Sequence, residues 1–340
     1  MLDHGRYILG PEVGELEQQL SEFCGAKHCL GVSSGTDALL IALMALDVGP
    51  GDEVITVPYT WISTAEVISL LGATPVFVDV EADTWNLDPK LLEAAITSKT
   101  KAIMPVGIYG QTADLNSIVE IADKHQLPVI EDAAQCFGAT HHGEQSCNLS
   151  TIGTTSFFPS KPLGGYGDGG AIFTSDDELA EKMRWIHVHG QKQKHHHPIL
   201  GLNGRLDSIQ AAIILEKLKL YPKEIGLRQG VAEFYNAGIK ASSDFAIQET
   251  KLGNTSVYAQ YTILCEERDV MQQLLKEQEV PSVGYYTVPL HLQPVFSELG
   301  HGKGDFPVTE RIADQCLSLP MSPYLSKQDQ SQVVNAFMKK

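Results

Sequence analysis

The sequence predicts an α/β protein whose core is a mostly parallel sheet, and two observations carry this prediction. The first is a set of short runs rich in β-branched residues, at 53–57, 75–80, 102–106 and 127–130. The second is the helix-length stretch of mixed polar and apolar residues between one run and the next. Because parallel neighbours require a crossover connection, usually a helix, this alternation indicates βαβ units with helices on both faces of the sheet.

Segments with helical periodicity precede and follow these runs. Residues 12–23 place their apolar side chains on one helical face, which predicts a surface helix. Residues 36–46 are almost wholly apolar, which predicts a buried helix. A strand-like run at 171–174 and a long helix at 205–218 complete the predicted N-terminal unit.

The chain is expected to contain two domains. Tyr221 and Pro222 interrupt the helical pattern that reaches residue 218, because proline cannot continue a helix interior. The residues that follow have the pattern of a smaller α/β unit. We therefore expect a large domain over residues 1–222 and a small C-terminal domain over residues 223–340.

The composition is that of an ordinary globular protein, with 340 residues, 43% hydrophobic residues and a formal net charge of −17. Broad nucleic-acid binding requires a basic face, which this charge disfavours. No apolar signal segment and no apolar stretch of about 18 residues occurs, so neither secretion nor membrane spanning is expected. The six cysteines lack CxxC spacing, which is typical of reduced thiols and favours a cytoplasmic protein.

Lys161 is the main candidate for chemistry. It stands in a glycine-rich loop, five residues after the hydroxyl of Ser156 and downstream of Asp132, which closes the apolar run at 127–130. An amine, a hydroxyl and an acid at a strand end together suit an aldehyde cofactor that needs an imine, a phosphate anchor and a counter-anion. This set favours pyridoxal 5′-phosphate (PLP), with its aminated form PMP. A surface lysine on a flexible loop is the alternative interpretation.

Asp132 would supply the counter-anion. A buried carboxylate requires a cationic or hydrogen-bonding partner, and the protonated ring nitrogen of PLP is such a partner. Keeping that proton makes the ring an electron sink. Gln135 could hydrogen-bond the phenolic oxygen of the ring. The alternative for Asp132 is a helix cap after the strand.

An anion site is predicted where Ser34, Gly35 and Thr36 precede the apolar helix, because a helix N-terminus presents free N–H groups and a positive dipole end. Ser156 is a second candidate phosphate donor. The alternative for the serine-rich turn is a simple N-cap. Trp61 could stack on the pyridine face, and a core tryptophan is an equally weighted alternative.

Several of these motifs occur in one order along the chain. The sequence resembles the DegT/StrS-type sugar aminotransferases, which are fold-type I PLP enzymes, through Ser33-Ser-Gly-Thr-Asp-Ala38, Pro58-Tyr-Thr-Trp61, Glu131-Asp-Ala-Ala-Gln135, Ser156-Phe-Phe-Pro-Ser-Lys161, Gly167-Asp-Gly-Gly170, His189-Gly190 and Gly201-Leu-Asn-Gly-Arg205. The resemblance implies an α/β fold with a smaller C-terminal domain and transfer of an amino group from L-glutamate to a keto group on a nucleotide-linked sugar. Relatives that act as dehydratases replace the lysine with histidine, so Lys161 favours amino transfer.

The resemblance also implies a homodimer with shared active sites. In such a dimer, Asn203 would reach the PLP phosphate of the neighbouring subunit, and Arg205 would reach its substrate. Tyr285, Tyr286 and His291 would line the sugar pocket, although Thr287 replaces the more common proline of this loop.

The finer resemblance is to the branch that acts on UDP-2-acetamido-2-deoxy-3-oxo-D-glucuronate in the synthesis of bacterial surface polysaccharide (O-antigen). The carboxylate of a uronate requires a cation, and the planar fork of Arg205 suits it. An aminotransferase for a dTDP-linked 3-keto or 4-keto-6-deoxy sugar is the alternative.

Other functional classes have weaker support. The tract His195–His197 lacks the i, i+4 spacing and the accompanying ligands of a metal site, so no metal is expected. A dinucleotide-binding oxidoreductase would require Gly-x-Gly-x-x-Gly after a strand, which is missing. A PLP-bound regulator without turnover would be favoured by a fused DNA-binding segment, and the chain shows none.

Overall fold

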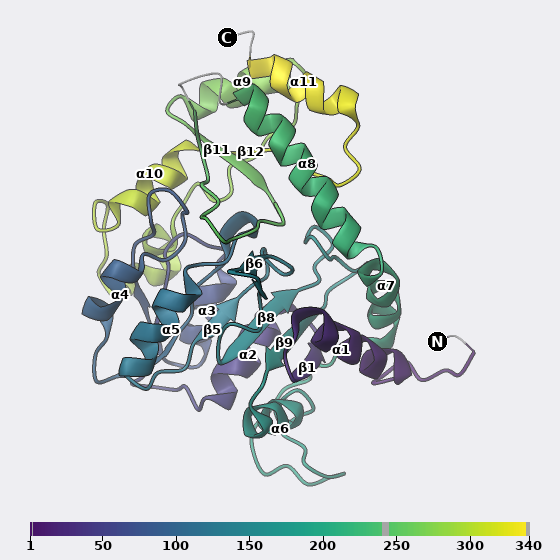
Figure 1. Cartoon of the computed structure of the whole chain (residues 1–340). Coiled ribbons are helices and arrows are strands. Elements are labelled where there is room, and N and C mark those ends of the chain that lie inside the picture. Colours follow the sequence, from purple (N-terminus) through teal and green to yellow (C-terminus); the bar gives the residue numbers. More distant parts are fainter. Residues whose placement is uncertain (2, 240–244, 338–340) are drawn as a thin grey trace.

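A computed structural model describes residues 1, 3–239 and 245–337 of the chain. It confirms the α/β class and the mostly parallel sheet (Figure 1). One group of strands has the order β1-β9-β8-β5 and a second has the order β3-β2-β4. Parallel bridges between Ile103 and Val129 and between Val106 and Asp132 join β4 to β5, so the two groups form one continuous sheet.

Every strand of this sheet is parallel to its neighbours except β9, which is antiparallel to both β1 and β8. The strand bounds are β1 (His28–Val32), β2 (Glu53–Thr56), β3 (Thr74–Phe77), β4 (Thr100–Ile103), β5 (Ile130–Asp132), β8 (Ile152–Ser156) and β9 (Gly170–Thr174). The chain reverses in the loop between β8 and β9, which carries Lys161. That loop therefore begins at the carboxyl end of β8.

Helices cover the sheet as the sequence pattern predicts. The buried helix is α2 (Gly35–Ala45), which packs among β8, β9, α3 and α6. The predicted surface helix is α1 (Pro11–Cys24), which packs on β1 and α7. The remaining covering elements are α3 (Ser63–Leu70), α4 (Pro89–Ala95), α5 (Leu115–Lys124), α6 (Asp177–Ile186), α7 (Ser208–Leu218) and the small hairpin β6 (Thr140–His141) and β7 (Glu144–Gln145).

The C-terminal part builds a second, antiparallel sheet with the order β10-β11-β12. Its elements are α8 (Tyr221–Ile239), β10 (Phe245–Ile247), β11 (Tyr261–Cys265), α9 (Arg268–Glu277), α10 (Pro307–Gln315), β12 (Cys316–Leu319) and α11 (Lys327–Phe337). In Figure 1 these elements lie above the main sheet, and α8 reaches down to α7. The helical pattern breaks at residues 219–220, between the end of α7 and the start of α8. Tyr221 and Pro222, which were expected to interrupt it, are instead the first residues of α8, where proline is tolerated. The two-domain division at residue 222 stays a prediction.

One stretch of the C-terminal half returns to the main sheet. Leu290, Phe296 and Phe306 pack in one cluster with Ala65 and Phe77 of the N-terminal half. The N–H of Leu290 also donates to the carbonyl of Pro58 at 2.8 Å. The segment that precedes Leu290 is therefore held beside α3, where the site is formed.

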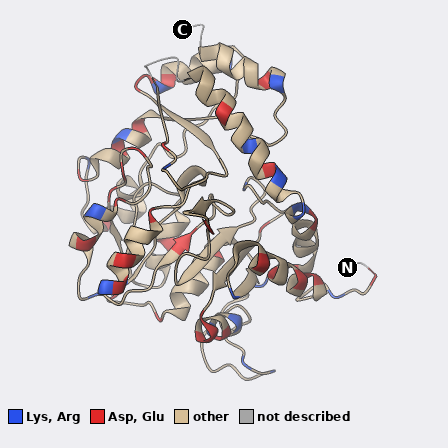
Figure 2. Ribbon diagram, viewed as in Figure 1, with Lys and Arg blue, Asp and Glu red and all other residues tan. Residues whose placement is uncertain are grey.

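Charged side chains of both signs are interspersed along the outer helices (Figure 2). In the described residues, no helix combines the length and the apolar character that crossing a bilayer would require.

Candidate active site

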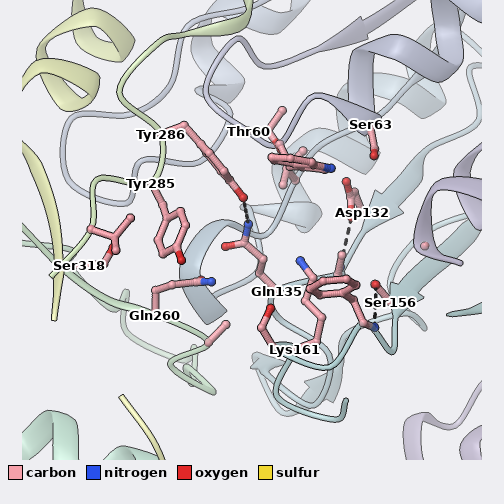
Figure 3. A pocket seen from close by; sticks show the side chains of 18 of the residues that line it. Thr60, Ser63, Asp132, Gln135, Ser156, Lys161, Gln260, Tyr285, Tyr286 and Ser318 are labelled. Atoms are coloured by element: carbon pink, nitrogen blue, oxygen red, sulfur yellow. Dashed lines mark hydrogen bonds between the residues drawn. The ribbon is translucent and has the colours of Figure 1, made fainter. Parts of the chain in front are cut away.

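A cavity of about 580 Å³ opens beyond the carboxyl ends of β4, β5 and β8. This is where open α/β sheets bind ligands. Lys161 and Asp132 both line it, which brings together the two residues on which the predicted chemistry depends (Figure 3). The opposite wall comes from the C-terminal part of the chain and includes Gln260, Tyr285 and Ser318.

Lys161 is half-buried and is held in a tight loop. Its N–H donates to the carbonyl of Phe158 at 2.8 Å, and the N–H of Gly165 donates to the carbonyl of Phe157 at 2.7 Å. Burial lowers the pKa of the Lys161 amine, and the charge of Asp132 partly opposes this shift. A lysine with a lowered pKa is a better nucleophile and a better base near neutral pH.

Asp132 is buried at the last position of β5. One carboxylate oxygen accepts from the hydroxyl of Thr64 at 2.9 Å, and the other accepts from the N–H of Ala134 at 3.1 Å. Burial raises the pKa of Asp132, while Ala134, Lys161 and Thr64 lower it. The sequence interpretation missed Thr64, whose only signal is its place in a polar pair at the start of a helix.

The residues predicted to bind an anion lie at one end of the cavity, namely Ser34, Gly35, Thr36 and Ser156. The first N–H groups of α2 have no partner inside the helix and carry the positive end of its dipole. A Cβ on Gly35 would lie 2.6 Å from Cβ of Ser156, so glycine is required for this close approach. The hydroxyl of Ser34 accepts from the N–H of Asp37 at 3.0 Å, so the N-cap interpretation is also correct for Ser34.

Thr36 has a partner that the sequence interpretation missed. Its hydroxyl lies 2.8 Å from the hydroxyl of Ser63, at the first residue of α3. Ser63 also lines the cavity. The N-termini of α2 and α3 therefore meet at the same end of the site.

Gln135 and Trp61, the predicted partners of the cofactor ring, both line the cavity. The Oε1 atom of Gln135 accepts from the N–H of Tyr109 at 2.8 Å, which directs its Nε2 group to the hydroxyl of Tyr286 at 3.4 Å. Trp61 is 55% exposed and its ring centroid lies 5.8 Å from that of Tyr286. An exposed side chain is not a core tryptophan, so the packing alternative for Trp61 is wrong.

Polar groups of the opposite wall have unused hydrogen-bonding capacity. Oε1 of Gln260 and Oγ of Ser282 are buried and have no partner among the described residues. Both residues line the cavity together with Ser318 and Tyr285. Neutral polar atoms of this kind suit the hydroxyl and amide groups of a substrate.

Three predicted site residues lie elsewhere in this chain. Asn203 is exposed and Arg205 is partly exposed, and neither lines the cavity. His291 is 1% exposed, with its ring 3.2 Å from a carboxylate oxygen of Glu310 and against the ring of Phe306. The expectation that His291 lines the sugar pocket therefore requires correction, because the turn at Leu290–Leu292 directs this ring into the protein interior.

The tract His195–His197 is exposed in the loop after α6. Among the residues that the structure describes, no group of three or more His, Cys, Asp or Glu side chains could hold a metal ion.

The donor set of the cavity fits PLP. Lys161 offers an amine for the aldehyde, and Asp132 offers a buried carboxylate for the ring N–H. The start of α2 and the hydroxyl of Ser156 offer hydrogen-bond donors that suit a phosphate. These groups come from three different strand ends and converge on one cavity.

Comparison with known proteins identifies the class. The family model described as the DegT/DnrJ/EryC1/StrS aminotransferase family matches residues 1–338, and the chain belongs to this family. It is a PLP-dependent aminotransferase with the fold-type I architecture.

Three similar proteins are informative about the branch. The chain is 54% identical to a UDP-2-acetamido-2-deoxy-3-oxo-D-glucuronate aminotransferase of Pseudomonas aeruginosa, over 96% of this chain and 89% of the relative. It is 39% identical to a dTDP-3-amino-3,4,6-trideoxy-alpha-D-glucose transaminase of Streptomyces venezuelae, over 99% of this chain and 89% of the relative. The crystal structure of NtdA from Bacillus subtilis with bound PMP superimposes with a TM-score of 0.93 at 32% identity, over 100% of this chain and 79% of that one.

Proposed function

We propose that this aminotransferase moves the amino group of L-glutamate to the C3 keto group of UDP-2-acetamido-2-deoxy-3-oxo-D-glucuronate. The observation that carries the proposal is the convergence of Lys161, Asp132 and the N-terminus of α2 on one cavity, in a chain 54% identical to an enzyme named for that substrate. The product would be a 3-amino sugar acid for bacterial surface polysaccharide such as O-antigen. Five cysteines are free thiols, which favours a cytoplasmic reaction: Cys24, Cys29, Cys136, Cys147 and Cys316.

When bound, PLP supplies an electron sink and carries the amino group between the two substrates. The Nζ atom of Lys161 would hold the cofactor. Once an incoming amine releases it, Nζ would accept a proton from the substrate carbon and later return one. The lowered pKa of Lys161 suits this work, because a base must be unprotonated at the pH of the reaction.

Asp132 would keep the proton on the ring nitrogen by remaining a carboxylate beside it. The hydroxyl of Thr64 and the N–H of Ala134 occupy one lone pair on each oxygen and fix the plane of the carboxylate. Trp61 would cover one face of the ring. Gly35, Thr36 and Ser156 would bind the phosphate.

We further propose that the active enzyme is a homodimer. Tyr7, Ile8 and Ile209 are each at least half exposed, and a bridge between Ile8 and Asp207 places them on one surface. Exposed apolar side chains that gather in this way are typical of an interface. Arg205 lies in the same stretch of chain, so a second copy covering this surface would bring its own Arg205 toward the cavity.

A uronate substrate supports this arrangement. Lys161 is the one basic residue among the described residues that line the cavity, and its amine is committed to the chemistry. A cation for the substrate carboxylate must therefore come from outside this chain's cavity wall. Arg205 of a second copy would supply it.

A panel of UDP- and dTDP-linked keto sugars with glutamate tests the proposal, with 2-oxoglutarate formation as the readout. Arg205→Ala should raise the KM for the uronate at least tenfold and change the KM for a neutral 3-keto sugar far less. If the dTDP-linked neutral sugar reacts faster with the wild-type enzyme, the alternative substrate is correct.

A further inference from the structure

Two buried tyrosine hydroxyls meet behind the cavity wall. The hydroxyls of Tyr59 and Tyr109 lie 2.6 Å apart, and each side chain is 1% exposed. The carbonyl oxygen of Tyr285 is within hydrogen-bonding reach of both hydroxyls, in the case of Tyr59 at 2.9 Å. Because each hydroxyl has a single proton, one of the two donates to this carbonyl while the other donates to its tyrosine partner. The hydroxyl of Tyr59 also accepts from the N–H of Tyr286 at 3.3 Å. The pair therefore binds both polar groups of the single peptide bond that joins Tyr285 to Tyr286.

These two tyrosines do not line the cavity, whereas the two residues that they hold do. Burial raises the pKa of both Tyr59 and Tyr109 well above that of an ordinary tyrosine, so their hydroxyls keep their protons. The pair is therefore a permanent hydrogen-bond donor to the carbonyl of Tyr285.

Tyr109 reaches two further lining residues through its backbone. Its N–H donates to Oε1 of Gln135 at 2.8 Å, and its carbonyl accepts from the N–H of Gln260 at 3.3 Å. Its φ of 62° lies in the left-handed region that side-chain-bearing residues seldom adopt. Such a conformation persists only where the surroundings determine it, and here three lining residues contact the same tyrosine.

We propose that Tyr59 and Tyr109 are positioning residues that fix the sugar-facing wall of the cavity by binding the Tyr285–Tyr286 peptide. The inference rests on the proposed function in one respect, namely that Tyr285 and Tyr286 face the sugar. Figure 3 shows Tyr285, Gln260 and Ser318 on one side of the cavity, opposite Ser156 and Asp132. A small amino donor needs Lys161 and the groups around it, whereas a nucleotide-linked sugar also extends to this far wall. Loss of the two hydroxyls should therefore weaken binding of the sugar more than it slows the reaction with glutamate.

Phenylalanine variants of the holoenzyme test the proposal. Tyr59→Phe and Tyr109→Phe remove only the hydroxyls and leave the backbone contacts of Tyr109 to Gln135 and Gln260 in place. Each single variant should raise the KM for the keto sugar a few-fold, and the double variant about tenfold, because the second hydroxyl can still serve the carbonyl when one is lost. When glutamate is added, the absorbance band of lysine-bound PLP should disappear at a rate within twofold of the wild-type rate.

Hydrogen exchange supplies a readout that needs no substrate. In the double variant, the amides of residues 284–290 should exchange at least tenfold faster, while those of β5 and β8 should keep the wild-type rate. Unchanged exchange in residues 284–290 would overturn the proposal. Equal losses in both half-reactions would also overturn it, because the effect would then not belong to the sugar wall.

Two matched variants distinguish the positioning role from a general loss of stability and from a failure of the proposed function. Tyr221→Phe removes a buried hydroxyl that donates to the carbonyl of Phe137 at 2.5 Å, away from the cavity. If Tyr221→Phe raises the KM for the keto sugar as much as Tyr59→Phe or Tyr109→Phe does, the positioning role is rejected. Tyr285→Ala removes the ring itself. If it leaves the KM for the sugar unchanged, the sugar-facing assignment in the proposed function fails, and hydrogen exchange still decides whether the hydroxyl pair holds the segment.

Discussion

At the residue scale, Lys161 and Asp132 have opposite pKa shifts with the same main cause. Burial disfavours the charged form of each group, so it lowers the pKa of the lysine and raises the pKa of the aspartic acid. Each charge partly offsets the shift of the other. A pair of this kind is typical of catalytic sites, because such sites shift the pKa of their groups by burial and by a neighbouring charge.

Thr64 should control how well Asp132 retains its charge. We expect Thr64→Val to weaken cofactor binding about tenfold, because a hydrogen bond to a charged group contributes about 1.5–3 kcal/mol. Thr64→Ser keeps the hydroxyl and should restore binding to within about twofold. The loss of cofactor from each variant during dialysis, monitored by absorbance, measures the two affinities. Wild-type affinity in the valine variant would show that Thr64 does not support the carboxylate.

At the element scale, β5 presents two carboxyl groups to opposite sides of the sheet. Asp132 faces the cavity, while Glu131 is buried among the thiols behind it and accepts from the N–H of Cys147 at 2.6 Å. Burial raises the pKa of Glu131 from 4.5 to about 7, and the charge of Asp132 adds to the shift. The strand therefore carries a second titratable group that the proposed reaction does not use.

Glu131→Gln should make stability less dependent on pH. The folded state of the wild type keeps this proton up to about pH 7, whereas the unfolded state loses it near 4.5, so folding is favoured at low pH. That contribution falls as pH rises between the two values, by about 3 kcal/mol in all. We expect the variant to equal the wild type near pH 4.5 and to exceed it by up to about 3 kcal/mol above pH 7. Urea denaturation at several pH values measures the difference, and parallel pH profiles would contradict the expectation.

The contact between α2 and β8 should tolerate no added side chain at Gly35. In Gly35→Ala, the new Cβ must displace Ser156, which should destabilise the protein by about 1–3 kcal/mol and weaken cofactor binding. Gly14→Ala is the matched control, because a Cβ at this position in α1 meets nothing within 4 Å. Thermal unfolding and cofactor titration of both variants are the measurements. Equal behaviour of the two would show that the contact at Gly35 is unimportant.

At the scale of the whole molecule, the sequence predicted those features that depend on local pattern. The alternating runs predicted the parallel strands, and the glycine-rich loop with an acid at a strand end predicted Lys161 and Asp132 in one cavity. It did not predict β1 or β8. The run Ile-Gly-Thr-Thr-Ser of β8 holds one large apolar residue and a glycine, so it lacks the apolar signal of a buried strand.

The rest of the site depends on contacts between distant segments. Tyr109 lies 176 residues before Tyr285, and Gln260 reaches the cavity only through the fold of the C-terminal sheet. Sequence proximity also misled at His291, which follows the cavity-lining tyrosines closely and yet turns inward to Glu310. A sequence pattern shows which residue types are present, whereas packing in the folded protein sets the direction of each side chain.

Dissociation of the proposed homodimer should leave each subunit folded. Ile8→Glu combined with Ile209→Glu should give a folded monomer without activity, because two charges would have to be buried in the interface. Sedimentation measures the assembly state. In addition, mixing Lys161→Ala with Arg205→Ala subunits should restore part of the activity, since a mixed dimer holds one intact shared site. A fully active monomer, or no recovery on mixing, would contradict the shared site.

The absorbance of the bound cofactor tests the central claim most directly. The purified wild-type protein should show the band of lysine-bound PLP, lose it when glutamate is added, and regain it when the keto sugar follows. Lys161→Ala should show neither change. A band that persists in the presence of glutamate, or amino transfer at the wild-type rate without Lys161, would contradict the account.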